Sequence, residues 1–161
     1  MSKVALFAGS FDPFTKGHLQ ILKKALAVFD EVVVAIMTND SKHYLLTTDE
    51  KIQVVKEAVA SLAGVRVIAR PATLTTDLAR QVGAQFLVRG LRNSADLEYE
   101  TGIAQMNQTL APEIQTVFLL ADQDNSFVSS SMIKEVLVFG GDVSAFLTPT
   151  AIEILSRKLK D

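Results

Sequence analysis

The sequence predicts an α/β protein that forms a single doubly wound, Rossmann-like domain around a five-stranded parallel sheet. Short runs that are apolar on both faces alternate along the chain with amphipathic helical patterns, and polar turns separate them. Strands buried on both faces are typical of parallel sheets that helices cover on both sides. Right-handed crossovers then produce the doubly wound arrangement. We expect one domain over residues 1–161.

The expected strands are five apolar runs, at residues 3–8, 31–37, 65–69, 86–88 and 116–121. The first run ends at Gly9, and Arg70-Pro71 stops the third because proline cannot donate to a strand ladder. Each run is short and continuous, as expected of a strand in the interior of a covered sheet. These runs therefore define the sheet.

The expected helices cover residues 18–29, 48–62, 75–82, 94–110, 131–139 and 150–160. Thr47 followed by Glu50 has the spacing of a capping box, which places the start of the second helix at Thr48. Gly83 stands at the C′ position of the third helix. Thr148 followed by Pro149 is an N-cap with proline at the first helical position. Helices thus alternate with all five strands.

Composition and charge exclude several classes of protein. The chain has 161 residues, 48% of them hydrophobic, and no cysteine, so disulfides, thiolate metal sites and cysteine nucleophiles are absent. The formal net charge is −2, which gives no reason to expect a nucleic-acid partner. No apolar run approaches the roughly 20 residues of a membrane-spanning helix. We expect a cytoplasmic protein that binds neither nucleic acid nor membrane.

Ligands of open parallel sheets bind beyond the carboxyl ends of the strands, so five loops are the place to look for a site. These loops contain His18, Lys42, Arg89, Arg92 and the run Ser129–Ser131, and no cluster of acidic residues. Cations, hydroxyl groups and helix N-termini are the groups that bind phosphates. The loops therefore predict a site for two phosphate-bearing ligands or for one long polyphosphate.

Each of these features also has a simpler structural explanation. A single histidine at a helix start is more often a surface residue than a catalyst, although the loop around His18 favours function. Glycines serve tight turns and close packing, and Ser129–Ser131 can be an N-cap alone. For one of the two arginines a salt bridge is a serious alternative, with Asp96, Glu98 and Glu100 as the candidate partners.

Several common catalytic motifs are missing. The sequence has no G-x-x-x-x-G-K-[ST] and no G-x-G-x-x-G after the first strand, which argues against a P-loop NTPase and against a nicotinamide or flavin enzyme. It also lacks G-x-S-x-G and H-E-x-x-H. Its Asp, Glu and His residues show no spacing typical of metal ligands. We therefore expect no protein-held metal.

Two segments resemble the signatures of the nucleotidyltransferase superfamily. Gly9–His18, with the sequence G-S-F-D-P-F-T-K-G-H, is similar to the superfamily's [ST]-x-G-H motif and the turn before it. Ser129–Ser131, preceded by Phe127-Val128, is similar to its second motif, I-S-S-[ST]. Lys42, the R-G-L-R run Arg89–Arg92 and the pattern D-x-E-Y-E-x-x-x-A-x-M-N at Asp96–Asn107 resemble bacterial phosphopantetheine adenylyltransferases. This resemblance extends from Val4 to Leu147.

The resemblance implies adenylyl transfer from ATP to 4′-phosphopantetheine, by in-line attack without a covalent enzyme intermediate. It assigns catalytic roles to His18, which would stabilise the transition state, and to Lys42 and Arg92. The implied ATP-binding residues are Ser10, Phe11, His18, Gly90, Leu91, Arg92, Glu100, Asn125, Ser126, Phe127, Val128, Ser129, Ser130 and Ser131. The implied phosphopantetheine-binding residues are Ser10, Lys42, Leu74, Thr75, Arg89, Met106 and Asn107.

The resemblance further implies that Mg²⁺ accompanies ATP, that coenzyme A is a feedback ligand, and that the chain forms a homo-oligomer, a hexamer of two stacked trimers. Three positions depart from the family pattern. Ser10 replaces a common threonine, Asn125 replaces a frequent aromatic residue, and Thr75 replaces a larger apolar one. Two other functions fit the same motifs: a nucleotidyltransferase with another acceptor, and a non-catalytic nucleotide sensor.

Overall fold

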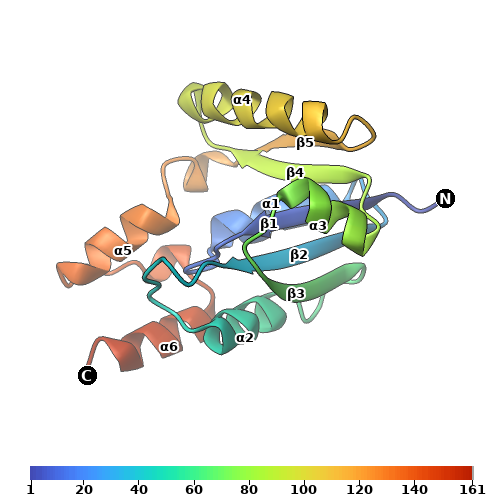
Figure 1. Ribbon diagram of the computed structural model, residues 1–161. Coiled ribbons are helices and arrows are strands. Elements are labelled where there is room, and N and C mark those ends of the chain that lie inside the picture. Colours follow the sequence, from blue (N-terminus) through green and yellow to red (C-terminus); the bar gives the residue numbers. More distant parts are fainter. Residues whose placement is uncertain (161) are drawn as a thin grey trace.

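Five parallel strands form one sheet in the computed structural model, which describes residues 1–160 (Figure 1). Asp161, the last residue of the predicted domain, lies outside the described residues. In spatial order the strands are β3 (Val65–Pro71), β2 (Glu31–Thr38), β1 (Val4–Gly9), β4 (Phe86–Leu91) and β5 (Gln115–Leu120). The chain builds outward from the central β1 first to one side and then to the other, so the topological switch point lies between β1 and β4. The predicted fold class is confirmed.

Alternate residues of the central strands pack into two separate hydrophobic cores. On one face, Phe7, Val34 and their neighbours pack with side chains of α1 (Lys16–Leu26), α2 (Thr48–Ala58), α5 (Ser130–Val138) and α6 (Pro149–Lys158). On the other face, Leu6, Val33 and their neighbours pack with α3 (Thr75–Val82) and with residues after α4 (Ser94–Leu110). Both faces of the sheet are therefore covered, as the apolar runs predicted.

Two boundaries differ from the prediction in ways that matter for the site. Helix α1 begins at Lys16, two residues before the predicted start, because Thr15 is its N-cap and accepts a hydrogen bond from the backbone N–H of His18. Strand β4 continues through Arg89, Gly90 and Leu91, which pair with β5. The R-G-L-R run, expected as a loop after residue 88, is thus mostly strand. Its first three residues are held by the sheet, and Arg92 follows directly after the strand.

Close packing accounts for the glycine in that run. A Cβ atom built on Gly90 would lie 2.9 Å from Cγ1 and 3.2 Å from Cδ1 of Ile21, a buried side chain of α1. Glycine at this position therefore lets α1 lie directly on β4. This contact brings α1 close to the R-G-L-R run that contains Arg89 and Arg92.

None of the helices within residues 1–160 combines the length and the apolar character that crossing a membrane requires.

Substituting Gly90 tests this packing. We expect Gly90→Ala to lower the free energy of unfolding by about 1–3 kcal/mol, because the added methyl group must displace Ile21 in a filled core. Gly102 is the matched control, since it lies in α4 and a Cβ there would meet no atom within 4 Å. Gly102→Ala should be neutral or stabilising by up to about 1 kcal/mol. Urea unfolding of both variants measures the difference, and equal effects would contradict the packing argument.

Candidate active site

A pocket of about 540 Å³ lies at the carboxyl ends of the central strands. Its walls come from the turn between β1 and α1, the loop after β2, the end of β4, the start of α4, and the segment that leads into α5. These are four of the five loops expected to form the site, with the start of α4 in addition. The loop after β3, which carries Leu74, does not reach this pocket.

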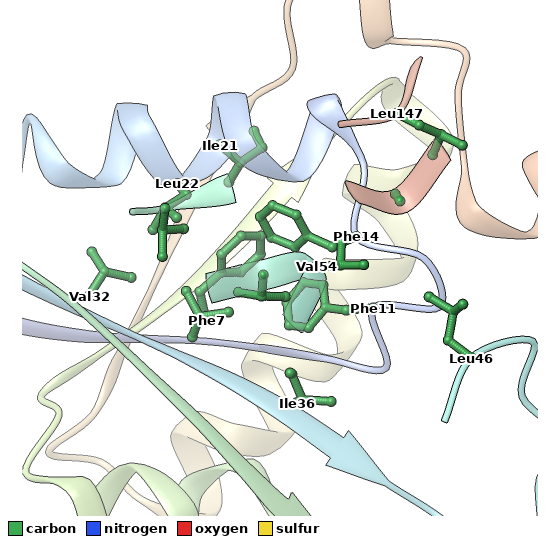
Figure 2. Close-up of a cluster of buried hydrophobic side chains, with 14 of the residues drawn as sticks. Phe7, Phe11, Phe14, Ile21, Leu22, Val32, Ile36, Leu46, Val54 and Leu147 are labelled. Carbon is green, nitrogen blue, oxygen red and sulfur yellow. The ribbon is translucent and has the colours of Figure 1, made fainter. Parts of the chain in front are cut away.

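The turn between β1 and α1 surrounds His18 with aromatic rings. Phe11 adopts a left-handed backbone conformation, with φ of 45°, and its ring packs against Gly9, where an added Cβ would lie 3.3 Å from Cζ of Phe11. The His18 ring centroid lies 5.1 Å from that of Phe11, 5.4 Å from that of Phe14, which it stacks on, and 6.3 Å from that of Phe7. Figure 2 shows the three phenylalanines within the larger core. The imidazole is therefore fixed by packing.

Hydrogen bonds determine which nitrogen of His18 carries the proton. The backbone N–H of Thr15 donates to Nδ1 at 2.9 Å, and the Thr15 hydroxyl lies 3.1 Å from the same atom. Because Nδ1 accepts from a backbone amide, its lone pair is occupied and the neutral ring carries its proton on Nε2. His18 thus closes the capping box of α1 through one nitrogen. The other nitrogen remains as a donor.

The surroundings of His18 keep it neutral. Burial lowers its pKa from 6.5 to about 4, and the positive charges of Arg89 and Arg92 contribute to that shift in the same direction. Near neutral pH the ring is therefore an imidazole, since protonation would place a third cation beside two guanidinium groups. An N–H donor that is neutral before the reaction can bind a phosphate oxygen without adding charge to the pocket.

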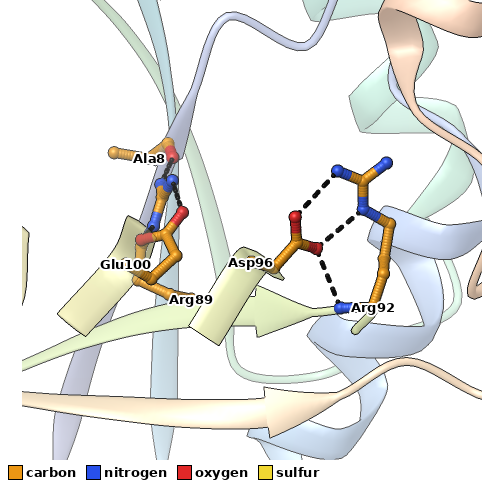
Figure 3. A network of polar contacts seen from close by, with 5 residues as sticks. All are labelled: Ala8, Arg89, Arg92, Asp96 and Glu100. Atoms are coloured by element: carbon orange, nitrogen blue, oxygen red, sulfur yellow. Dashed lines mark hydrogen bonds and ion pairs between the residues drawn. The ribbon is translucent and has the colours of Figure 1, made fainter. Parts of the chain in front are cut away.

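Both arginines of the site are paired with carboxylates of α4 (Figure 3). Arg89 donates from Nε and Nη2 to the two oxygens of Glu100, at 2.9 and 2.7 Å, and from Nη1 to the carbonyl of Ala8. Arg92 donates from Nε and Nη2 to Asp96, at 2.9 and 3.2 Å. The salt-bridge alternative, considered for one arginine, therefore applies to both.

The two pairs leave different numbers of donors available. The side chain of Arg89 donates three hydrogen bonds to protein acceptors, from Nε, Nη1 and Nη2. The side chain of Arg92 donates two, from Nε and Nη2, so that both N–H groups on its Nη1 have no protein acceptor within residues 1–160. Arg92 also holds the pKa of the Asp96 carboxyl below its usual range, chiefly through the side-chain hydrogen bond. We infer that Arg89 is fixed in orientation and that Arg92 is the more adaptable cation.

The N-terminus of α5 forms a further part of the pocket wall. The Ser129 side chain accepts from the backbone N–H of Met132 at 3.0 Å, so Ser129 is the N-cap as the simpler explanation proposed. The Ser130 hydroxyl donates to the carbonyl of Pro13 at 2.9 Å and ties α5 to the first turn. The first amides of a helix have no acceptor within the helix, and together with the helix dipole they attract anions.

Most of the predicted site residues come together in this pocket. It is lined by Ser10, Phe11, His18, Lys42, Arg89, Gly90, Arg92, Glu100, Asn125, Val128, Ser129, Ser130 and Ser131. A smaller pocket of about 180 Å³ adjoins it, shares Arg89 and Glu100 with it, and is also lined by Thr75 and Asn107. The roles of these residues stay predictions, but their juxtaposition is a fact of the fold.

Five predicted residues line neither pocket. Leu91 is buried in β4, and Ser126 is partly exposed. The other three are exposed: Leu74, Met106 and Phe127. Leu74 directly precedes Thr75 at the start of α3, and Met106 directly precedes Asn107 on α4. Both residues are therefore next in sequence to a residue of the smaller pocket without lining it themselves. The ligand roles predicted for all five remain untested.

Several residues of the main pocket were not predicted from the sequence. Asp12 and Lys134 form an ion pair at 2.7 Å in its wall, and Tyr44, Asp96 and Tyr99 are among the other residues that line it. Asp12 was visible as part of the first motif, and Lys134 as the residue one helical turn after Ser130. Their pairing joins two segments far apart in the chain, which periodicity does not reveal.

Comparison with known proteins first defines the class. A model of the cytidylyltransferase-like family matches residues 6–136. A bifunctional NMN adenylyltransferase/ADP ribose pyrophosphatase from Francisella tularensis superposes with a TM-score of 0.76 at 14% identity, over all of this chain and 51% of that one. A putative nicotinate-nucleotide adenylyltransferase from Vibrio parahaemolyticus gives 0.66 at 20% identity, over 96% of this chain and 99% of that one. The chain is a nucleotidyltransferase of the cytidylyltransferase-like class.

Similarity of sequence then narrows the family. The chain is 52% identical to the phosphopantetheine adenylyltransferase of Lacticaseibacillus paracasei, over 99% of this chain and 95% of that protein. It is 48% identical to the phosphopantetheine adenylyltransferase of Latilactobacillus sakei, over 98% and 96%. The chain belongs to the phosphopantetheine adenylyltransferase family, as its motifs predicted.

The pKa of His18 can be measured directly. The chain has two histidines, so His43→Gln leaves one imidazole to follow by NMR. We expect it to titrate near pH 4, well below 6.5. The unfolded chain then binds a proton that the folded chain does not, so the free energy of unfolding falls as the pH drops from 6.5 toward 4. The slope is about 1.4 kcal/mol per pH unit for one proton, and titration near 6.5 would contradict this account.

Proposed function

We propose that this protein transfers the adenylyl group of ATP to the phosphate of 4′-phosphopantetheine, producing dephospho-coenzyme A and pyrophosphate. This reaction is the penultimate step of coenzyme A synthesis. Membership of the family supports the choice of substrates. The observation that carries the chemistry is the neutral His18, fixed with its Nε2–H as the remaining donor in a pocket that also holds Arg89 and Arg92.

The reaction needs positioning and charge stabilisation more than a protein nucleophile. A phosphate oxygen of the acceptor attacks the α-phosphorus of ATP, a new P–O bond forms, and the bond to the departing pyrophosphate breaks. Negative charge builds up on the α-phosphoryl oxygens and on the leaving group. We assign the Nε2–H of His18 to an α-phosphoryl oxygen, where a fixed donor stabilises the transition state without reorganisation.

The cations divide between the two substrates in this proposal. Arg92, with donors still available, would meet the distal phosphates of ATP together with the amides at the start of α5. Lys42 lines the pocket without an acidic partner among residues 1–160, and Arg89 lies between the two pockets. We place the acceptor phosphate between Lys42 and Arg89, so that it approaches from the side opposite to the leaving group.

The smaller pocket supports a place for the pantetheine arm. It opens from Arg89 and Glu100, and Thr75, Ile103 and Asn107 line it with both polar and apolar groups. An arm that carries amides and methylene groups suits such walls. Coenzyme A contains the same arm, so we expect it to compete for this pocket as a feedback ligand.

We propose that Mg²⁺ enters with ATP. Residues 1–160 hold no group of three His, Cys, Asp or Glu side chains placed to ligate a metal ion. Mg²⁺ retains several waters and binds readily through substrate phosphates, so the triphosphate itself would carry the ion. There it would offset the negative charge of the phosphates while Arg92 and α5 bind their remaining oxygens.

We further propose that the chain forms a homo-oligomer, for which the family suggests a hexamer. Helix α4 supports this proposal because Glu100 alone of its 17 residues is buried. The exposed apolar side chains on it are Leu97, Tyr99, Ile103, Met106 and Leu110. A second copy packed on this helix would remove that surface from water, and it would also cover the exposed Met106.

Pyrophosphate release tests the function. Purified protein with ATP and Mg²⁺ should release pyrophosphate when 4′-phosphopantetheine is added, and mass spectrometry should detect dephospho-coenzyme A. Nicotinamide mononucleotide and a blank without acceptor are the matched controls. Release with nicotinamide mononucleotide but not with 4′-phosphopantetheine would keep the protein in the nucleotidyltransferase class but give it another acceptor. ATP binding without release for any acceptor would favour a nucleotide sensor.

Substituting His18 separates its chemical role from its capping role. His18→Asn keeps an acceptor for the Thr15 amide but removes the donor at Nε2, whereas His18→Ala removes both. We expect both variants to lose turnover by several orders of magnitude, with ATP affinity within about tenfold of the wild type, because the donor acts chiefly in the transition state. His18→Asn should unfold at a higher temperature than His18→Ala. Equal losses of affinity and turnover would remove His18 from this role.

A further inference from the structure

One buried carboxylate connects three separate segments of the pocket wall. Asp12 lies in the turn before α1 and is 2% exposed. Its Oδ2 accepts from the backbone N–H of Leu45 and its Oδ1 from that of Leu46, each at 2.8 Å. The Nζ of Lys134, on α5, lies 2.7 Å from Oδ2. Asp12 therefore joins the turn that precedes His18, the loop that carries Lys42, and helix α5, whose N-terminus lines the pocket.

A second cation lies close to this carboxylate. Lys51, on α2, is fully buried, and its Nζ has no hydrogen-bond acceptor within residues 1–160. The ammonium lies 3.4 Å from the centroid of the Tyr44 ring. Burial lowers the pKa of Lys51, while the charge of Asp12 raises it and that of Lys134 lowers it. The negative charge of Asp12 thus offsets two ammonium groups.

The loop after β2 is held at both ends by these groups. Tyr44 stacks on the ammonium of Lys51, and its hydroxyl accepts from the backbone N–H of Asn39 at 3.0 Å. Leu45 and Leu46, directly after Tyr44, donate to Asp12. Lys42 lies between these anchors, exposed, with its own N–H bonded to the carbonyl of Asn39. The place of Lys42 relative to His18 therefore depends on how Asp12 holds the loop.

We propose that Asp12 is a positioning residue for adenylyl transfer, which sets the distance from Lys42 and the start of α5 to His18 through its bonds to Leu45, Leu46 and Lys134. The proposal rests on the proposed function, in which Lys42 binds the acceptor phosphate. Asp12 itself touches neither substrate in this assignment. A displacement of about 1 Å in such a group can cost about 100-fold in rate.

The decisive variant is Asp12→Asn, which keeps the size of the side chain and removes its charge. We expect kcat to fall about 100-fold, with the KM for phosphopantetheine raised more than the KM for ATP, because the Lys42 loop shifts most. Asp30→Asn is the matched control. Asp30 also accepts from a backbone N–H, that of Lys3 at 2.7 Å, but at the amino ends of the strands. We expect this control to retain wild-type kinetics.

A second readout is independent of activity. Hydrogen exchange of the Leu45 and Leu46 amides reports the bonds to Asp12 directly, and we expect it to accelerate at least about tenfold in Asp12→Asn, while amides within β2 stay protected. Slow turnover with unchanged exchange would overturn the proposal, and so would faster exchange with unchanged kinetics. If the wild type releases no pyrophosphate, only the proposed function is contradicted. The hydrogen-exchange measurement needs no substrate and still tests how Asp12 holds the loop.

Lys134→Gln keeps the test valid if Asp12→Asn does not fold, because Lys134 is half-exposed and its loss leaves the bonds to Leu45 and Leu46 in place. If Lys134 acts through Asp12, Lys134→Gln on its own lowers kcat and leaves the KM for ATP unchanged, and where Asp12→Asn folds it has almost no further effect in the double variant. A raised KM for ATP in Lys134→Gln on its own would show instead that Lys134 binds phosphate directly. That result would overturn the claim that Lys134 acts through Asp12.

Discussion

The imidazole of His18 caps helix α1 through one nitrogen and leaves the other as a hydrogen-bond donor, and the first role determines the second. Its Nδ1 closes the first turn of α1 by accepting from Thr15, and that bond leaves the proton on Nε2. Phe7, Phe11 and Phe14 hold the ring by packing against it. A ring so enclosed is poorly solvated, so it remains neutral near pH 7. Helix capping, packing and chemistry therefore select the same tautomer and the same orientation.

Because His18 is neutral near pH 7, it adds no positive charge to the pocket, and the arginines must supply that charge. Two guanidinium groups near one another would repel, and the carboxylates of Asp96 and Glu100 offset that repulsion. Glu100 is buried, and leaving a buried carboxylate without its partner is costly, so we expect Arg89 to keep Glu100 when substrates bind. Arg92 can add a phosphate to its existing pair. The chain thus builds a positive pocket in a protein whose formal net charge is −2.

The sequence predicted the elements well because buried parallel strands and capped helices leave local signals. Capping at Thr47 and Thr148 and the C′ glycine Gly83 placed helix ends that the structure confirms within a residue. The end of β4 was wrong because Gly90 has the local character of a loop, and its contact with Ile21 depends on tertiary packing. Asp12 and Lys134 were missed for a related reason. Their pairing depends on how α5 returns to the first turn, and no local pattern reports that distance.

The three departures from the family pattern fall on walls of the pockets and leave the charged groups in place. Ser10 keeps a hydroxyl in the main pocket, and Thr75 lines the smaller one. Asn125 is buried, and its Cβ would lie 3.5 Å from a Cβ built on Gly17, so the segment before α5 lies close to the first turn of α1. The fold alone does not decide the acceptor, because structures at 14% and 20% identity share it and carry names of adenylyltransferases with other substrates. Selectivity must therefore come from walls such as these, while in the proposed mechanism His18, Lys42, Arg89 and Arg92 would serve any phosphate acceptor seated beside them.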